Sequence, residues 1–178
     1  MPGWGNPLAS LQIWLDSPAE EADNRGKPQE SRQARFVDWL LRRNSLSLQD
    51  VYVGYTLRCF IPKNFLKKKA ERLPALSACN QHHNFDICKL AKAIVALGEI
   101  SCLEFMGATK VGEVAGSWQD YKEPWKHRVY GGYAPGYCMA DPSESVGVSR
   151  SIWFAALHVG LEPKICEKEL QAFDWDIF

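Results

Sequence analysis

The sequence predicts an α/β protein, a three-layer sandwich in which a four-stranded parallel sheet carries helices on both faces. Short apolar segments rich in β-branched and aromatic residues alternate with segments of helical periodicity, which implies parallel crossover connections. One of these segments, Ala93–Leu97, is apolar throughout, as expected for a parallel strand buried on both faces. The chain has 178 residues, of which 46% are hydrophobic, enough for one domain with a core.

The first half of the chain contains two predicted strands and one predicted helix. "LQIWL" (Leu11–Leu15) is a short apolar strand, and a long polar loop follows it. Ser31 can cap the next helix, 32–44, because apolar residues recur there at helical spacing after a hydroxyl side chain. "DVYVGYTL" contains the second strand, 51–56, which is rich in β-branched and aromatic residues.

The second half continues the alternation. We expect a helix over about 75–90, the third strand at Ala93–Leu97, and a helix that Gly107 ends. The fourth strand lies at 129–133, and the last helix covers 143–160. Because sites in α/β proteins form beyond the carboxyl ends of parallel strands, the loops at Asp16, Tyr55 and Ala134 should converge at one edge of the sheet.

Charge and composition limit the function classes. Basic and acidic residues number 21 each, which argues against a general nucleic-acid coat but allows a local basic patch. No apolar run approaches the roughly 20 residues that span a bilayer, and the N-terminal segment lacks the pattern of a secretory signal. We therefore expect an intracellular, cytoplasmic protein. The composition shifts after Pro163, which predicts a folded domain at 1–162 and a tail at 163–178.

Several segments, in the right order and at sensible distances, resemble the uracil-DNA glycosylase superfamily, especially its bacterial iron–sulfur branch. The likeness runs from about Gly3 to about His158. The segments that carry it are "GWGNPLASLQIWL", "DNRGKP", "DVYVGYTLRCFIP", "LSACN", "KAIVALG" and "YAPGYCMADP". The resemblance implies a protein that flips a base out of DNA and stabilises charge as the glycosidic bond breaks.

The residues that the resemblance places at the site depart from the family's pattern. The family's first loop reads Gly-Glu-Ala-Pro-Gly, and here Asp16 keeps the acid while the flanking glycines are lost. Gln29 stands where the family has an aromatic platform, Tyr55 where it has a pyrimidine-reading asparagine, and Ala134 where it has a histidine. An oxyanion donor such as that histidine is worth about 3 kcal/mol. The degenerate pocket positions are Leu15, Ser17, Pro18, Gln29, Tyr55, Tyr133 and Ala134.

The predicted site residues also have ordinary structural explanations. Asp16 is either a catalytic acid or a carboxylate that caps a helix or fixes a loop. For Tyr55 and Tyr133 the commoner role is that of core aromatics whose hydroxyls reach solvent, and Ala134 fits as a packed turn residue.

The resemblance also bears on cofactors. The resembled branch holds a four-iron cluster on four cysteines, of which Cys59 and Cys79 match only the second pair. A cluster needs four thiolates, so we expect no iron–sulfur cluster, no other cofactor and no metal, with Cys59 and Cys79 as a remnant. A zinc site that adds His82 and His83 is disfavoured, because adjacent helical residues point about 100° apart.

Two features suggest partners. Lys67, Lys68, Lys69 and Arg72 could contact DNA phosphates, and Tyr137 and Met139 follow the Ala134 turn where the family inserts an apolar wedge into the duplex. A solvated loop is the alternative for the lysines. The chain ends "LQAFDWDIF", and its Phe173, Trp175 and Phe178 resemble the anchors of peptides that dock on sliding clamps or of the tips of single-strand-binding proteins. The alternative is a C-terminal segment packed on its own domain.

These observations favour a catalytically degenerate member of the superfamily, a pseudoenzyme that serves as an accessory or interaction protein in DNA replication or repair. An active DNA glycosylase with a remodelled pocket and altered base specificity is the alternative. A third, weaker possibility is an assembly protein that reuses the fold without nucleic acid.

Overall fold

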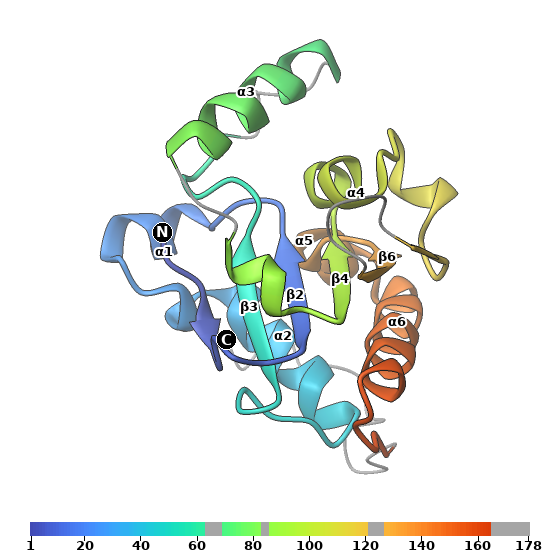
Figure 1. The fold of residues 1–178 in the computed structure, drawn as a ribbon. Coiled ribbons are helices and arrows are strands. Elements are labelled where there is room, and N and C mark those ends of the chain that lie inside the picture. Colours follow the sequence, from blue (N-terminus) through green and yellow to red (C-terminus); the bar gives the residue numbers. More distant parts are fainter. Residues whose placement is uncertain (63–68, 83–85, 121–126, 165–178) are drawn as a thin grey trace.

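The structure, a computed structural model, describes residues 1–62, 69–82, 86–120 and 127–164 (Figure 1). Within these ranges the chain forms one six-stranded sheet with the strand order β1-β3-β2-β4-β6-β5. The predicted tail beyond residue 164, with Phe173, Trp175 and Phe178, lies outside the described residues, as do Lys67 and Lys68.

The four central strands are parallel and lie where the sequence predicts them. They are β2 (Leu11–Leu15), β3 (Val51–Tyr55), β4 (Ala93–Leu97) and β6 (Arg128–Gly132). β2 pairs with β3 on one side and with β4 on the other, and β4 pairs with β6. The predicted alternation of strands and helices therefore produces the parallel core of the sheet.

The prediction of only four strands is wrong at both edges of the sheet. β1 (Trp4–Gly5) pairs antiparallel with β3, and β5 (Trp118–Asp120) pairs antiparallel with β6. These strands are two and three residues long, too short to show an alternating pattern. They form because the outer strands of the parallel core offer unpaired backbone groups.

Hydrophobic clusters cover both faces of the sheet. On one face, Leu11, Ile13 and Leu15 of β2 pack in the same cluster as residues of α2 (Arg32–Arg43), α5 (Pro135–Ala140) and α6 (Ser145–His158). On the other face, Trp14 lies in a cluster with Cys102 and Phe105 of α4 (Glu99–Met106). Because successive side chains of a strand point to opposite faces of the sheet, the strands contribute residues to two separate hydrophobic clusters.

Local signals set several helix boundaries. Ser31 caps α2, since its Oγ accepts the backbone N–H of Ala34 at 3.1 Å, as predicted. Gly107 ends α4 with a left-handed φ of 66°, also as predicted. The predicted polar loop after β2 instead contains a short helix, α1 (Glu20–Arg25). The helix predicted over about 75–90 is α3 (Lys69–His82), which begins earlier than expected, and residues 86–90 form a 3-10 turn instead of its last part. The 3-10 turns are Pro28–Glu30, Asp86–Leu90, Val111–Glu113 and Pro142–Glu144.

Helix α3 extends away from the sheet (Figure 1). Its Leu76 packs with Ile100 and Leu103 of α4 and with Leu57, which follows β3. Across the described part of the chain, no helix has the length and apolar character that crossing a membrane requires.

Candidate functional site

The carboxyl ends of the four parallel strands meet at one edge of the sheet, as the sequence predicts. Leu15 lies opposite both Tyr55 and Leu97, and Leu97 lies opposite Gly132. The loops that begin at Asp16, Thr56, Gly98 and Tyr133 are therefore neighbours. This edge brings together Leu15, Asp16, Ser17, Pro18, Tyr55, Tyr133 and Ala134.

Asp16 is engaged with the amino terminus of α4. Its Oδ1 accepts the backbone N–H of Ile100 at 2.9 Å and that of Ser101 at 2.8 Å. The residue at the helix N-cap is Gly98, which has no side chain to offer. Asp16 thus satisfies two of the four amide groups that the first turn of a helix leaves unpaired.

Gly98 makes this contact possible. Its φ is 115°, a conformation that residues with a Cβ rarely adopt. A Cβ at this position would collide with the carboxyl group of Asp16. The glycine that ends the apolar strand therefore serves to admit the carboxylate, which sequence reasoning did not anticipate.

Two hydroxyls complete the arrangement around Asp16. The Oγ1 of Thr56 and the Oγ of Ser101 lie 2.9 Å apart, and both side chains are buried. The backbone N–H of Thr56 donates to the carbonyl of Leu15, and that of Leu57 to the carbonyl of Asp16. One signal in the sequence could have pointed to this cluster. α4 starts at a glycine without a capping side chain, so its amides need an acceptor from another element.

Burial changes the acidity of Asp16. Desolvation raises the pKa of its carboxyl group from 3.8 to about 6, against the backbone and side-chain hydrogen bonds from Ser101 and the backbone hydrogen bond from Ile100, which lower it. The charge of Glu99 adds to the rise. Asp16 is therefore poised to exchange a proton near pH 6, while its Oδ1 is held by the helix.

Tyr55 and Leu15 are core residues at the ends of the paired strands β3 and β2. Both belong to the core cluster on the α2 face, and Tyr55 is 1% exposed. The ring of Tyr55 lies 5.5 Å from that of Trp4. The prediction that Tyr55 is a core aromatic agrees with this position, but its hydroxyl is buried and does not reach solvent as expected. Burial raises the pKa of its phenol.

The hydroxyl of Tyr55 has no hydrogen-bond partner among the described residues. The side chain of Ser31 lowers the phenol's pKa, against the larger effect of burial. The Ser31 hydroxyl itself donates to the carbonyl of Pro28 and accepts the N–H of Ala34. A phenol held in this way cannot read the edge of a pyrimidine beyond the sheet.

Ala134 begins α5 and offers no side-chain group to the site. Its backbone has extended φ and ψ angles of −62° and 148°, as at a helix N-cap, and its carbonyl accepts the N–H groups of Tyr137 and Cys138. Tyr133 stacks on Tyr137, with ring centroids 4.7 Å apart and planes inclined by 19°. Tyr137 is 50% exposed, and Met139 is partly exposed, so this turn presents aromatic and apolar surface to solvent.

A cavity of about 310 Å³ lies beyond the end of β6. It is lined by Gly132 and Tyr133 together with Glu144 and Arg150 near the start of α6. Neither Asp16 nor Tyr55 is among the described residues that line it. Gln29 is exposed in the 3-10 turn before α2, Pro18 is buried, and Ser17 is partly buried.

The two cysteines that the resemblance matched to cluster ligands lie in different settings. Cys59 is exposed in the loop after β3, whereas Cys79 packs on the cluster formed by α3 and α4. Among the residues that the structure describes, no group of three or more histidine, cysteine, aspartate or glutamate side chains is placed to hold a metal ion.

Of the basic candidates for DNA contact, Lys69 and Arg72 fall within the described residues, and both belong to α3. Lys69 is the first residue of α3. Arg72 forms an ion pair with Glu99 at the start of α4, and its side chain is only 14% exposed. This pairing ties α3 to α4 and leaves the guanidinium little surface for phosphate.

No model of a known protein family matches the chain.

Proposed function

We propose that the chain is a catalytically degenerate protein with a uracil-DNA glycosylase-like fold, a three-layer sandwich, that acts as an accessory or interaction protein in DNA replication or repair. The parallel core and the shared edge of its loops agree with the fold that the resemblance implies. The proposed loss of catalysis rests on the packing at the carboxyl edge of the sheet. Leu15 and Tyr55 are core residues at the edge where a base would be held, and α4 engages the carboxylate of Asp16.

The missing groups explain why excision is not expected. Breaking the glycosidic bond needs donors aimed at the charge that develops on the base, and the methyl group of Ala134 supplies none. Reading the base needs a donor and an acceptor side by side, and Tyr55 turns a single phenol into the core instead. Loss of both groups at one edge removes recognition together with catalysis.

A chain without catalytic activity would still be able to contact DNA and other proteins. The exposed Tyr137, stacked on Tyr133, and the partly exposed Met139 stand where the family places a wedge. We further propose that the C-terminal segment 173–178 anchors a replication protein such as a sliding clamp, through its aromatic side chains.

A second candidate, an active DNA glycosylase with a remodelled pocket, draws on one observation. Asp16 is an acid whose pKa is about 6 at the carboxyl edge of the sheet, and perturbed carboxylates gather at catalytic sites. Its bonds to the α4 amides give the same carboxylate a structural role, which is why we place this candidate second.

An excision assay separates the two candidates. The full chain is incubated with single-stranded and mismatched DNA that contains uracil or another altered base, and abasic sites are then cleaved with alkali. We expect no turnover above that of buffer. Turnover comparable to that of an ordinary glycosylase, lost in Asp16→Asn, would overturn the proposal and establish the second candidate.

DNA contact is tested on the same preparation by fluorescence anisotropy. Tyr137→Ala should weaken binding to a mismatched duplex, because it removes the exposed ring of the stacked pair. Leu8→Ala is the matched control, since Leu8 is also an exposed apolar side chain, at 76%, in the loop before β2. Equal affinities for both variants, or no binding by the parent chain, would remove DNA contact at this turn from the proposal.

A further inference from the structure

The outer face of α6 is apolar where a solvent-facing helix is ordinarily polar. Val146, Phe154 and Leu157 are 49%, 50% and 48% exposed, and the exposed Arg150 stands between them. Their spacing of four, four and three residues places all four on one stripe of the helix. We call this stripe the α6 face.

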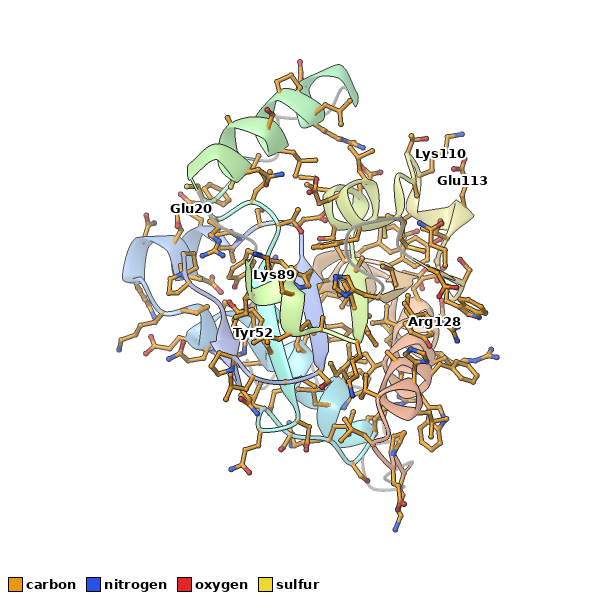
Figure 2. All side chains as sticks on the ribbon, in the orientation of Figure 1. Glu20, Tyr52, Lys89, Lys110, Glu113 and Arg128 are labelled. Atoms are coloured by element: carbon orange, nitrogen blue, oxygen red, sulfur yellow. The ribbon has the colours of Figure 1, made fainter. Side chains whose placement is uncertain are left out.

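Two grooves flank the α6 face. One, of about 270 Å³, lies against the end of α2, where Arg43, Asn44 and Trp153 join the stripe. The other, of about 490 Å³, lies against β5 and β6. There Trp118 is 53% exposed and the guanidinium of Arg128 lies 3.9 Å from its ring centroid (Figure 2 labels Arg128 beside α6).

The charges around the α6 face favour an acidic ligand. Arg43, Arg150 and Arg128 line the grooves, and no acidic residue is among the described side chains that do. Asp120, which does not line the groove, forms an ion pair with Arg128, with Nε and Oδ1 3.1 Å apart. Arg43 and Arg150 therefore supply most of the attraction for an acidic ligand. An apolar surface flanked by arginine side chains is complementary to a peptide in which aromatic and acidic residues alternate.

We propose that the α6 face binds the C-terminal segment 173–178 of the same chain. That segment reads "FDWDIF", with aromatic Phe173, Trp175 and Phe178 around two aspartates. The docking does not depend on the proposed function. It adds a consequence for it, since a partner that takes these aromatic side chains must first displace them from α6.

The path of the described chain brings the segment within reach. After α6 the chain turns back, and the N–H of Lys164 donates to the carbonyl of Asn44 at 3.1 Å. Asn44 lines the first groove and its side chain donates to Ser149, in the first half of α6. The nine residue-to-residue steps from Lys164 to Phe173 can span about 30 Å, whereas the 14 residues of α6 rise about 21 Å. Such a short tether gives an effective concentration in the millimolar range.

Photocrosslinking in the full chain tests this docking. Phe178 is replaced by p-benzoyl-phenylalanine, the protein is irradiated, and the adducts are mapped by mass spectrometry. We expect adducts within one chain on residues 146–157 of α6 or on Arg43 or Trp118, at a yield independent of protein concentration. Adducts on other surfaces, or no adducts, would overturn the proposal. Crosslinked dimers in place of intramolecular adducts would show that a second copy is the occupant, and would overturn it too.

Charge and contact variants show whether the contact is specific. Arg150→Glu should lower the yield about fivefold, the upper range for one exposed ion pair, and Asp174→Lys with Asp176→Lys in the same chain should restore it. Phe154→Ala should lower it about fivefold or more, as truncation of an interface anchor does. Arg32→Glu, an exposed arginine at the far end of α2, is the matched control and should leave it unchanged. Circular dichroism confirms that each variant is folded. Equal yields for Arg150→Glu and Arg32→Glu would refute the charge argument and with it the choice of occupant.

Discussion

Replacing Asp16 by asparagine isolates the charge of this carboxylate from its hydrogen bonds. Asparagine has almost the same shape, and its Oδ1 can still accept the N–H groups of Ile100 and Ser101. What disappears is the negative charge that burial disfavours. The variant therefore measures how much the folded protein loses by keeping an ionised carboxylate at this edge of the sheet.

The size of the effect follows from the pKa. A rise from 3.8 to about 6 is roughly two units, and each unit is worth about 1.4 kcal/mol, so the effect amounts to about 3 kcal/mol. Because Asp16 keeps part of its surface in water, this value is an upper limit. The folded pKa lies above the unfolded one, so the stability that protonated Asp16 contributes is fully present below pH 3.8 and is lost as pH rises through about 6. The advantage of Asp16→Asn over the parent chain in free energy of unfolding should therefore be small at pH 4 and reach its full size at pH 8.

Urea denaturation of both chains between pH 4 and pH 8 provides the measurement. The difference between the two chains at each pH removes the contributions of other titrating groups, such as His127, whose pKa burial lowers. Asp16→Ala is the control, because it removes both charge and acceptor and should be about 1 kcal/mol less stable than Asp16→Asn at every pH. A constant difference between Asp16→Asn and the parent chain from pH 4 to pH 8, or a less stable asparagine variant at pH 8, would refute this account of Asp16.

Three further substitutions test the packing around the site. Gly98→Ala should lower the free energy of unfolding by about 2 kcal/mol or more in urea, because it combines a positive φ with a clash against Asp16, whereas Gly26→Ala, strained in φ but open in space, should cost less. Tyr55→Phe should leave the free energy of unfolding in urea unchanged or raise it by up to about 1 kcal/mol, since the lost hydroxyl has no partner among the described residues, and clear destabilisation would show that it has one. Ser31→Ala should lower the melting temperature by the equivalent of about 1 kcal/mol through loss of the α2 cap, and an unchanged melting temperature would contradict that role.

Short-range sequence patterns determined the central strands and several helix ends of this protein. The apolar runs at Leu11–Leu15 and Ala93–Leu97, the hydroxyl of Ser31 before an amphipathic helix and the glycine at 107 each act within a few residues of the chain. Such signals specify strands and helix ends because backbone conformation and side-chain periodicity are local properties. The order of the elements then required parallel crossovers, which set the loops after the strands at one edge.

Contacts between distant segments decided what that edge can do. The sequence left Asp16 open between a catalytic acid and a cap, and the amides it binds lie 84 and 85 residues further along the chain. The two edge strands are equally invisible in the sequence, because each exists only through pairing with a longer neighbour. The sequence alone could show which groups stand at the site, but whether a carboxylate is free or held depends on which backbone amides the folded chain brings to it, and burial together with those amides sets its charge.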